Sequence, residues 1–485
     1  MKKNILKIIT VITISLIMPS CSDYLELEPK DNLIQQEFWK SKEQVSAAVA
    51  GCYASMNQAD FTSKALLWGE LRAEMLVSVR AGNNERNMLK NYILPTSSLV
   101  KWNSFYKTIN FCNLVLDFAD EAKENDLSFT EEELKAFKAE ARAIRSLVYF
   151  ILVRNFKEVP LILVGTSSNE VDFYPAKNTE EEILAQIISD LKLCVQDLPV
   201  GYAKSIKHDK GKINKGSALA ILADVYLWAN QYNNCIDACN EIIALGKYNL
   251  VEGTEWFNQI FFEGNSTEGI FELQFSDINT TFKNYFYELS PYFAPFGGTQ
   301  DLYEEIPNDI RGERASYDLS RNSVFKYSGV DASAGVFRTT QEFFNTFIFY
   351  RYSDVLLMQA EAYLLSTDRQ DLNQAYSLIN QVHERATGAV LGAVISQTTL
   401  LDAVLLERQK EFAFEGKRWY DLLRFDRRND FSELLILTMA EEKTTADDYE
   451  VIISNFTDPE SYFLPIDQNE INLNRNLEQN PYYIN

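Results

Sequence analysis

Residues 215–245 read KGSALAILADVYLWANQYNNCIDACNEIIAL, and this stretch decides the fold. Its apolar residues recur every three or four positions on both sides of a short polar break. That spacing predicts two helices, about 214–229 and 232–245, joined by a tight turn. The second helix ends at Gly246, a residue type typical of helix C-termini. Small residues where the two helices touch, flanked by large ones, are the pattern of a tetratricopeptide repeat.

The same pattern returns downstream after a long gap. Its positions are Leu356, Ala360 and Tyr363 on one helix, and Ala375, Ile379 and Val382 on the next. Capping boxes predict further helix starts on the N-terminal side, at Ser41 with Gln44, Thr130 with Glu133, and Thr179 with Glu182. We therefore predict a mainly α fold with an interrupted tetratricopeptide-like scaffold over about 41–246 and 348–429.

Residues 247–347 interrupt the scaffold and have a different texture. Glycines and aromatic residues become frequent there, and helical periodicity fades apart from a short strand predicted near Ile270–Phe275. Residues 277–299 carry many aromatic rings without a regular pattern, which is typical of a functional or a poorly ordered loop. We predict that this loop-rich insertion binds a ligand, and that residues 430–485 form a loop-rich tail to a single domain over 21–485.

The N-terminus predicts export. Three early lysines precede an apolar run, Ile8–Met18, and Ser20 stands directly before Cys21. The run is about 11 residues, too short to cross a bilayer, which takes roughly 20. We predict that residues 1–20 are a lipoprotein signal peptide and that Cys21 becomes the lipidated first residue. The alternative is an ordinary secretory signal followed by an incidental cysteine.

Composition excludes several classes of function. The net charge of −23 repels phosphate backbones, so nucleic-acid binding is not expected. With only two histidines, His-based triads and metal centres are disfavoured, and we predict no cofactor and no metal. Cys235 and Cys239 lie four apart on one helix, but no second pair follows at zinc-ligand spacing. We expect them and the other cysteines beyond Cys21 to be buried free thiols.

Six segments, in order along the chain, carry a resemblance. They are 21–29 (CSDYLELEP), 139–161 (AEARAIRSLVYFILVRNFKEVPL), 215–229 (KGSALAILADVYLWA), 351–365 (RYSDVLLMQAEAYLL), 406–425 (LERQKEFAFEGKRWYDLLRF) and 462–483 (YFLPIDQNEINLNRNLEQNPYY). Together they resemble the SusD/RagB family of surface nutrient-binding lipoproteins of Bacteroidetes. The resemblance implies a non-enzymatic protein on the outer face of the outer membrane. It would capture an oligosaccharide, or another nutrient, and deliver it to a SusC-like TonB-dependent transporter.

Two segments have the residue types that a sugar site needs, namely aromatic faces for C–H surfaces and forked polar groups for hydroxyls. We predict polar contacts from Arg80, Asn83, Asn84 and Arg86, in a loop, and stacking from Tyr285, Tyr287, Tyr292 and Phe296. The alternative for each ring is a place in the core or against the transporter. The net charge disfavours an anionic polymer, whereas Arg80 and Arg86 favour one.

Two rival functions stay open. A surface glycoside hydrolase needs two carboxylates at a suitable separation, which an acidic chain can supply. The charged residues of 406–425, predicted as one helix with ion pairs along its flank, are a catalytic cluster in that interpretation and a structural network in ours. Trp102, Phe105 and Tyr106 are expected to fill a core. The second rival is a tetratricopeptide scaffold that binds only protein.

Overall fold

The computed structural model describes residues 38–166, 172–304, 306, 308–392, 394–443 and 448–484. The predicted signal peptide and Cys21 therefore lie outside the described residues. The helices are α3 Lys42–Met56, α4 Ala59–Glu70, α5 Asn83–Leu89, α6 Asn103–Asn125, α7 Glu131–Phe156, α8 Glu180–Asp197, α9 Ile206–Gly211, α10 Lys215–Trp228, α11 Tyr232–Ala244, α12 Thr280–Phe286, α13 Thr299–Glu304, α14 Phe325–Ser328, α15 Tyr352–Leu365, α16 Leu372–Thr387, α17 Gln397–Glu411, α18 Arg418–Arg427, α19 Leu435–Glu442, α20 Tyr449–Asn455 and α21 Gln468–Leu473. The strands are β1 Leu76–Ser78, β2 Gly269–Leu273, β3 Phe293–Pro295, β4 Gly329–Asp331, β5 Val336–Phe337 and β6 Phe347–Arg351.

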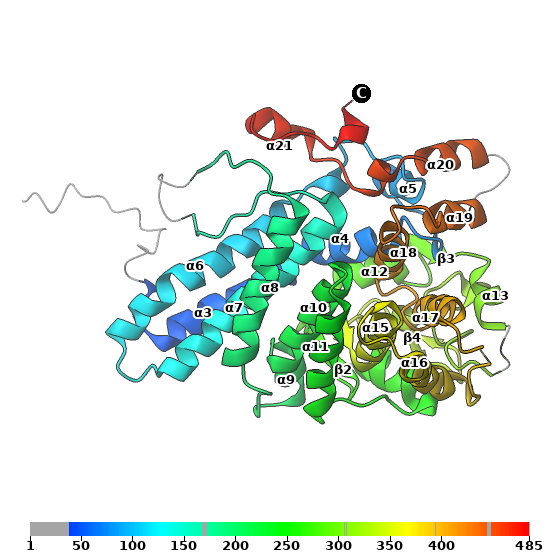
Figure 1. The fold of residues 1–485 in the computed structure, drawn as a ribbon, viewed down its shortest axis with the longest axis horizontal. Coiled ribbons are helices and arrows are strands. Elements are labelled where there is room, and N and C mark those ends of the chain that lie inside the picture. Colours follow the sequence, from blue (N-terminus) through cyan, green and yellow to red (C-terminus); the bar gives the residue numbers. More distant parts are fainter. Residues whose placement is uncertain are drawn as a thin grey trace, which may run out of the picture.

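The long helices pack one after another into a continuous array (Figure 1). α6 packs on α7, α7 on α8, and α8 on α10; α10 pairs with α11, α11 packs on α15, and α15 pairs with α16. The two predicted helix pairs are thus observed, and they touch directly although residues 247–347 separate them in sequence. The mainly α prediction is confirmed, while membership of the pairs in the tetratricopeptide class stays a prediction.

Local signals explain where these helices begin and end. At the start of α7, Thr130 N donates to Glu133 Oε2 at 3.0 Å and Glu133 N donates to Thr130 Oγ1 at 3.2 Å, so the predicted capping box is present. The same reciprocal bonds join Thr179 and Glu182 at the start of α8. Past the end of α11, Gly246 adopts a φ of +60°, which glycine tolerates without strain.

The five cysteines beyond Cys21 are free and buried, as predicted. Cys235 and Cys239 lie on the α11 face that packs against α10 and α15, where Cys235 Sγ lies 3.9 Å from the Met358 carbonyl oxygen. Burial raises the pKa of the Cys235 thiol well above its ordinary value, so it stays protonated. None of the helices in the described ranges is long and apolar enough to span a membrane.

Short elements organise the aromatic insertion more than the sequence predicted. The predicted strand near residues 270–275 is β2, which pairs antiparallel with β6. Residues 277–299, predicted as irregular, contain α12 and β3 instead. Asn279 caps α12 by accepting a bond from Phe282 N at 3.2 Å. Phe282 and Phe286, four apart, both stack on Tyr327, with ring centroids 4.1 and 5.1 Å away. That packing stabilises a helix of two turns, which flanking glycines and prolines hid in the sequence.

The predicted single helix over 406–425 is wrong. The chain turns between α17 and α18, where Phe414 and Gly416 adopt φ values of +68° and +73°. The charged residues consequently pair across elements, as in Arg408 Nε to Asp421 Oδ1 at 2.8 Å. They form the structural network of our preferred interpretation, and one pair, Arg424 with Asp421 at 3.0 Å, also runs along α18.

Candidate ligand-binding site

A two-stranded ribbon joins the two segments that the sequence singled out. β1 and β3 are antiparallel, with Leu76 opposite Pro295 and Ser78 opposite Phe293. Further backbone bonds lengthen the ribbon at both ends: Arg80 N donates to Tyr292 O at 3.2 Å, and Phe296 N donates to Met75 O at 2.9 Å. The ribbon from Met75 to Arg80 spans roughly 17 Å. The structure thereby brings Arg80, Tyr292 and Phe296 onto one small element.

At one end of the ribbon, Arg80 and Tyr292 form an exposed platform. The guanidinium carbon of Arg80 lies 5.9 Å from the centroid of the Tyr292 ring, and Arg80 Nη2 donates to the Ser290 carbonyl oxygen. Arg80 is exposed and Tyr292 is half-buried. These contacts orient the Tyr292 ring, which combines an apolar surface with a hydroxyl group.

The other predicted polar residues lie on α5, not in the loop that we expected. Arg86 Nη2 donates to Asn83 Oδ1 one turn earlier, and Asn84 Nδ2 donates to Ser98 Oγ at 2.9 Å. Asn83 and Arg86 are exposed, and Asn84 is half-buried. Their side chains therefore bond to each other and to Ser98.

One of the four predicted stacking rings is buried, and a second packs against a neighbouring ring. Tyr285 is only 8% exposed, and its ring packs edge-on against Phe293 with centroids 5.3 Å apart, so this residue belongs to the core. Tyr287 is half-buried and lies edge-on against Phe343 at 6.1 Å. The helical phase of α12 turns the Tyr285 ring inward, which composition alone did not reveal. Stacking by Tyr287, Tyr292 and Phe296, all half-buried, stays a prediction.

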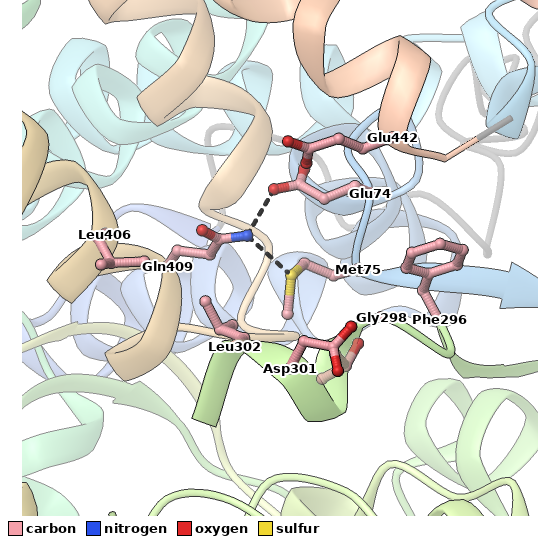
Figure 2. A pocket seen from close by; sticks show the side chains of 10 residues that line it. Glu74, Met75, Phe296, Gly298, Asp301, Leu302, Leu406, Gln409 and Glu442 are labelled. Atoms are coloured by element: carbon pink, nitrogen blue, oxygen red, sulfur yellow. Dashed lines mark hydrogen bonds between the residues drawn. The ribbon is translucent and has the colours of Figure 1, made fainter. Parts of the chain in front are cut away.

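At the other end of the ribbon, Phe296 borders a cleft of about 520 Å³ (Figure 2). The cleft is built where the start of β1, the turn after β3, α13, α17 and α19 converge. Its lining residues are Glu74, Met75, Phe296, Gly298, Thr299, Asp301, Leu302, Leu406, Gln409 and Glu442. In Figure 2 the Phe296 ring and the Leu406 side chain stand on opposite sides, with the carboxylates of Glu74 and Glu442 above and Asp301 below.

Glu74 is fixed in place with one oxygen left free. Gln409 Nε2 and Arg418 Nε each donate to Glu74 Oε1 at 2.7 Å. Glu74 is 5% exposed, yet its Oε2 has no hydrogen-bond partner among the described residues. The same holds within the described chain for Thr299 Oγ1, in a residue only 3% exposed. A buried polar atom without a partner is costly, and a water molecule or a polar ligand that reaches these two atoms would satisfy them.

Glu442 is exposed at the edge of the cleft. Packing on one side desolvates its carboxyl group and, together with the nearby negative charge of Glu74, raises its pKa above the ordinary value. Carboxylates therefore set the electrostatics of the cleft, and a hydroxyl group that can donate a hydrogen bond is a good match for them.

A second cavity, of about 590 Å³, has a more aromatic wall. Tyr106, Phe173 and Tyr174 line it, and the two last rings are more than half exposed. Two of its polar groups are already bonded, however: Tyr106 Oη donates to Pro160 O at 2.7 Å, and Asn474 Nδ2 donates to Pro175 O at 2.8 Å. The first cleft is therefore the better candidate site.

The expectation about the nearby aromatic residues is confirmed for two of the three. Phe105 is fully buried between Phe61 and Trp68, at 4.4 and 4.7 Å, and Trp102 is 5% exposed. Tyr106 packs edge-on against Trp102 and reaches the second cavity.

Sequence reasoning missed most of the cleft. Glu74, Thr299, Gln409 and Glu442 come from four distant segments, and no spacing connects them. Two local signals existed. Glu74 shortly precedes the predicted segment Arg80–Arg86, and Thr299 directly follows the Gly297–Gly298 pair. A carboxylate and a hydroxyl group flanking the two predicted segments were candidates on that ground.

Family models match most of the chain in two pieces. Residues 312–483 match the model described as "SusD family", and residues 23–227 match the one described as "Starch-binding associating with outer membrane". The chain belongs to the SusD/RagB family. A SusD-like protein of Formosa agariphila is 26% identical over 485 aligned positions, covering 87% of this chain and 91% of the relative. A SusD-like protein of Bacteroides ovatus is 24% identical, covering 87% and 82%.

Solved structures of SusD proteins share the fold of this chain. A SusD superfamily protein of Bacteroides vulgatus superposes with a TM-score of 0.76 at 24% identity, covering 92% of this chain and 99% of that one. A structure titled "Laminarin binding SusD-like protein" gives a TM-score of 0.71 at 20% identity, covering 92% and 100%. The helical frame described above is thus the frame of a SusD protein.

Proposed function

We propose that this SusD-family chain is a cell-surface lipoprotein that binds a glycan and delivers it to a SusC-like TonB-dependent transporter. One observation carries the binding part: the cleft holds two buried polar atoms, Glu74 Oε2 and Thr299 Oγ1, that lack partners among the described residues. The Phe296 ring borders the same cleft, and the Arg80–Tyr292 platform lies at the other end of the same ribbon.

This combination suits a sugar chain. The apolar face of a sugar ring packs on Phe296 or Tyr292, and its hydroxyl groups donate to Glu74 Oε2 and exchange a bond with Thr299. Because the ribbon is roughly 17 Å long, one extended oligosaccharide can touch both ends. The match to a family described as starch-binding and the similarity to a laminarin-binding SusD-like protein support this class of ligand.

The location and the partner rest on the N-terminus and on the family. The model matching residues 23–227 is described as associating with the outer membrane, and the lipidation signal predicted at Cys21 supplies an anchor. A Cys21→Ala variant is expected to leave the membrane fraction. A tagged wild-type chain is expected to co-purify with a TonB-dependent transporter from detergent-solubilised outer membranes, and its isolation without one contradicts the delivery step.

Binding is tested by calorimetry of the purified chain, without residues 1–20, against starch, laminarin, xylan, mannan, polygalacturonate and alginate. We expect saturable binding of at least one glycan, and we expect it to weaken in a Tyr292→Ala, Phe296→Ala variant. Tyr174→Ala, which alters the exposed wall of the second cavity, is the matched control and is expected to bind normally. No binding across the whole panel contradicts the proposal.

One observation favours catalysis as a second candidate function. Glu74 and Glu442 share a cleft and the pKa of Glu442 is raised, as for the acid of a hydrolytic pair. We nevertheless propose binding without turnover, because Glu74 is locked in place by Gln409 and Arg418. Reducing-end assays on the bound glycan test this. Release of reducing ends that disappears in Glu442→Gln favours the hydrolase.

A further inference from the structure

We propose that the cleft selects uncharged, hydroxyl-rich glycans and rejects chains that carry uronate or sulfate groups. Glu74, Asp301 and Glu442 are the residues that impose this choice. The inference rests on the proposed function. It favours the expectation from net charge, which disfavours an anionic polymer, over the expectation from Arg80 and Arg86.

The charge around the cleft is negative. Three of the lining residues are acidic, and among the described residues that line it none is a lysine or an arginine. Asp301 and Glu442 stand at the open edge, whereas Glu74 is buried. An anionic ligand entering here therefore meets like charges in a partly desolvated space, where repulsion is stronger than in water.

The nearby cations Arg418 and Lys443 are outside the cleft lining and bond to Glu74 and to the main chain. Arg418 donates to Glu74. Lys443 Nζ, next to Glu442 in the chain, donates to the carbonyl oxygens of Arg72 and Ala73 at 3.0 and 3.1 Å. These bonds hold the positive charges behind the wall of the cleft.

The two arginines that favoured an anionic ligand in the sequence lie outside the cleft lining. Arg80 is bonded to Ser290 and lies over Tyr292 at the far end of the ribbon, and Arg86 is bonded to Asn83. Neither lines the cleft. Their first role is to fix the platform and α5, so they do not offset the three carboxylates.

The polar atoms without partners favour a hydroxyl group of the ligand. A hydroxyl group both donates and accepts, so it satisfies Glu74 Oε2 and Thr299 Oγ1 together. A ligand carboxylate or sulfate only accepts, so it leaves Glu74 Oε2 unpaired and adds repulsion. The free acceptor and the surrounding charges thus favour the same kind of ligand.

The test uses matched glycans. The neutral glycan that binds most tightly in the panel is compared with the same glycan after its primary hydroxyl groups are oxidised to carboxylates, and with the methyl ester of that product. We expect the oxidised form to bind at least about tenfold more weakly, and the ester to recover affinity, because three carboxylates repel one more. Raising NaCl from 50 to 500 mM is expected to narrow the gap.

Variants assign the effect to the cleft. Asp301→Asn with Glu442→Gln alters two exposed residues, so folding is expected to be retained. It is expected to narrow the affinity gap between the oxidised glycan and its parent, and both affinities are measured in the variant because the two residues line the cleft. Glu74→Gln is the second variant and is expected to act in the same direction. Glu304→Gln with Glu433→Gln, at exposed positions outside the cleft lining, is the charge-matched control and should leave the gap unchanged.

The outcomes separate the two proposals. Equal affinity for the oxidised and parent glycans, or a wild-type preference for an anionic glycan that Tyr292→Ala weakens, overturns the selection while the binding function stands. A gap that neither cleft variant narrows also overturns it. Absence of binding to every glycan overturns the proposed function itself, and the selection falls with it.

Discussion

Two groups of carboxylates in this molecule have different surroundings. In the arginine network, defined as Arg351, Arg311, Arg385 and Lys326 with Glu268, Glu407, Glu411 and Glu415, every carboxylate faces a cation. Arg351 Nη2 lies 3.0 Å from Glu415 Oε1, and Arg311 Nη1 lies 2.6 Å from Glu407 Oε1. In the cleft, by contrast, Glu74 keeps one oxygen without a partner among the described residues.

The pKa directions follow that difference. Burial alone would raise the pKa of Glu411, but Arg385, Arg351 and Arg311 outweigh it and hold the pKa well below its ordinary value. At Glu442, burial and the charge of Glu74 act together and raise the pKa. Paired carboxylates stabilise the fold, and incompletely paired ones are available to a ligand. The comparison teaches that partnership, more than burial, separates a structural charge from a functional one.

The largest expected effect comes from breaking the arginine network. Arg351→Met leaves Glu268, Glu411 and Glu415 short of a cation and is expected to cost about 3–5 kcal/mol of unfolding free energy. Chemical denaturation followed by circular dichroism measures it. Arg369→Met removes an exposed pair with Asp237 and is expected to cost less than about 1 kcal/mol. Equal losses of unfolding free energy in the two variants would show that the buried network stabilises the fold no more than an exposed ion pair does.

A smaller effect is expected from acid. Burial alone would raise the pKa of Asp354, but Lys417 and Arg408 lower it to about 2. Since the folded pKa lies below the unfolded value of about 3.9, this group stabilises the fold above pH 4, by about 2 kcal/mol. That contribution is lost as the pH falls from about 4 to about 2, together with those of Glu407, Glu411 and Glu415, whose pKa values are also lowered.

Denaturation midpoints between pH 7 and pH 2 measure this loss. Asp354→Asn removes one titrating group and is expected to flatten the acid limb of the curve. A wild-type chain whose stability is constant down to pH 2 would contradict the assignment.

On the side of the cleft and its ribbon, Tyr292→Ala is expected to weaken glycan binding about tenfold, which is about 1.4 kcal/mol. Stability should change little, because Tyr292 is half-buried at the surface. Calorimetry with the glycan identified in the panel measures the effect, with Tyr174→Ala as control. A loss in the control instead would move the site to the second cavity.

The smallest effect is also the sharpest comparison, because it sets an unpartnered hydroxyl group against a partnered one. Thr299→Val removes Oγ1, which has no partner in the described chain, and should lower glycan affinity about threefold without loss of stability. Thr62→Val removes a hydroxyl group 2.7 Å from Thr281 Oγ1 and should cost about 1 kcal/mol of stability with affinity unchanged. The same pattern in both variants would remove the distinction between the two regions.

The sequence predicted the frame well because its signals are local. Periodicity placed α10, α11, α15 and α16, and capping boxes placed the starts of α7 and α8. The break between α17 and α18 was missed, because Gly416 stands inside an otherwise helical pattern. Tertiary packing sets it there: a Cβ at Gly416 would lie 3.2 Å from the Leu66 carbonyl oxygen.

The ligand region was predicted only in outline. Aromatic and polar composition found the two segments, and the structure joined them through β1 and β3. Composition did not show that the Tyr285 ring faces inward, since that depends on the phase of α12. It also did not show that Glu74, Gln409 and Glu442 converge. Such convergence is a property of the packed chain and has no counterpart in residue spacing.

The direct contact of α11 with α15 makes residues 247–347 resemble an interchangeable cassette, because both of its ends return to adjacent helices. Grafting that cassette from another SusD protein is an obvious route to a chain that binds a different ligand. The arginine network limits such exchange, since Glu268, Arg311 and Lys326 belong to the cassette whereas Arg351, Glu411 and Glu415 belong to the frame. A working chimera must transplant both halves of that ionic lock.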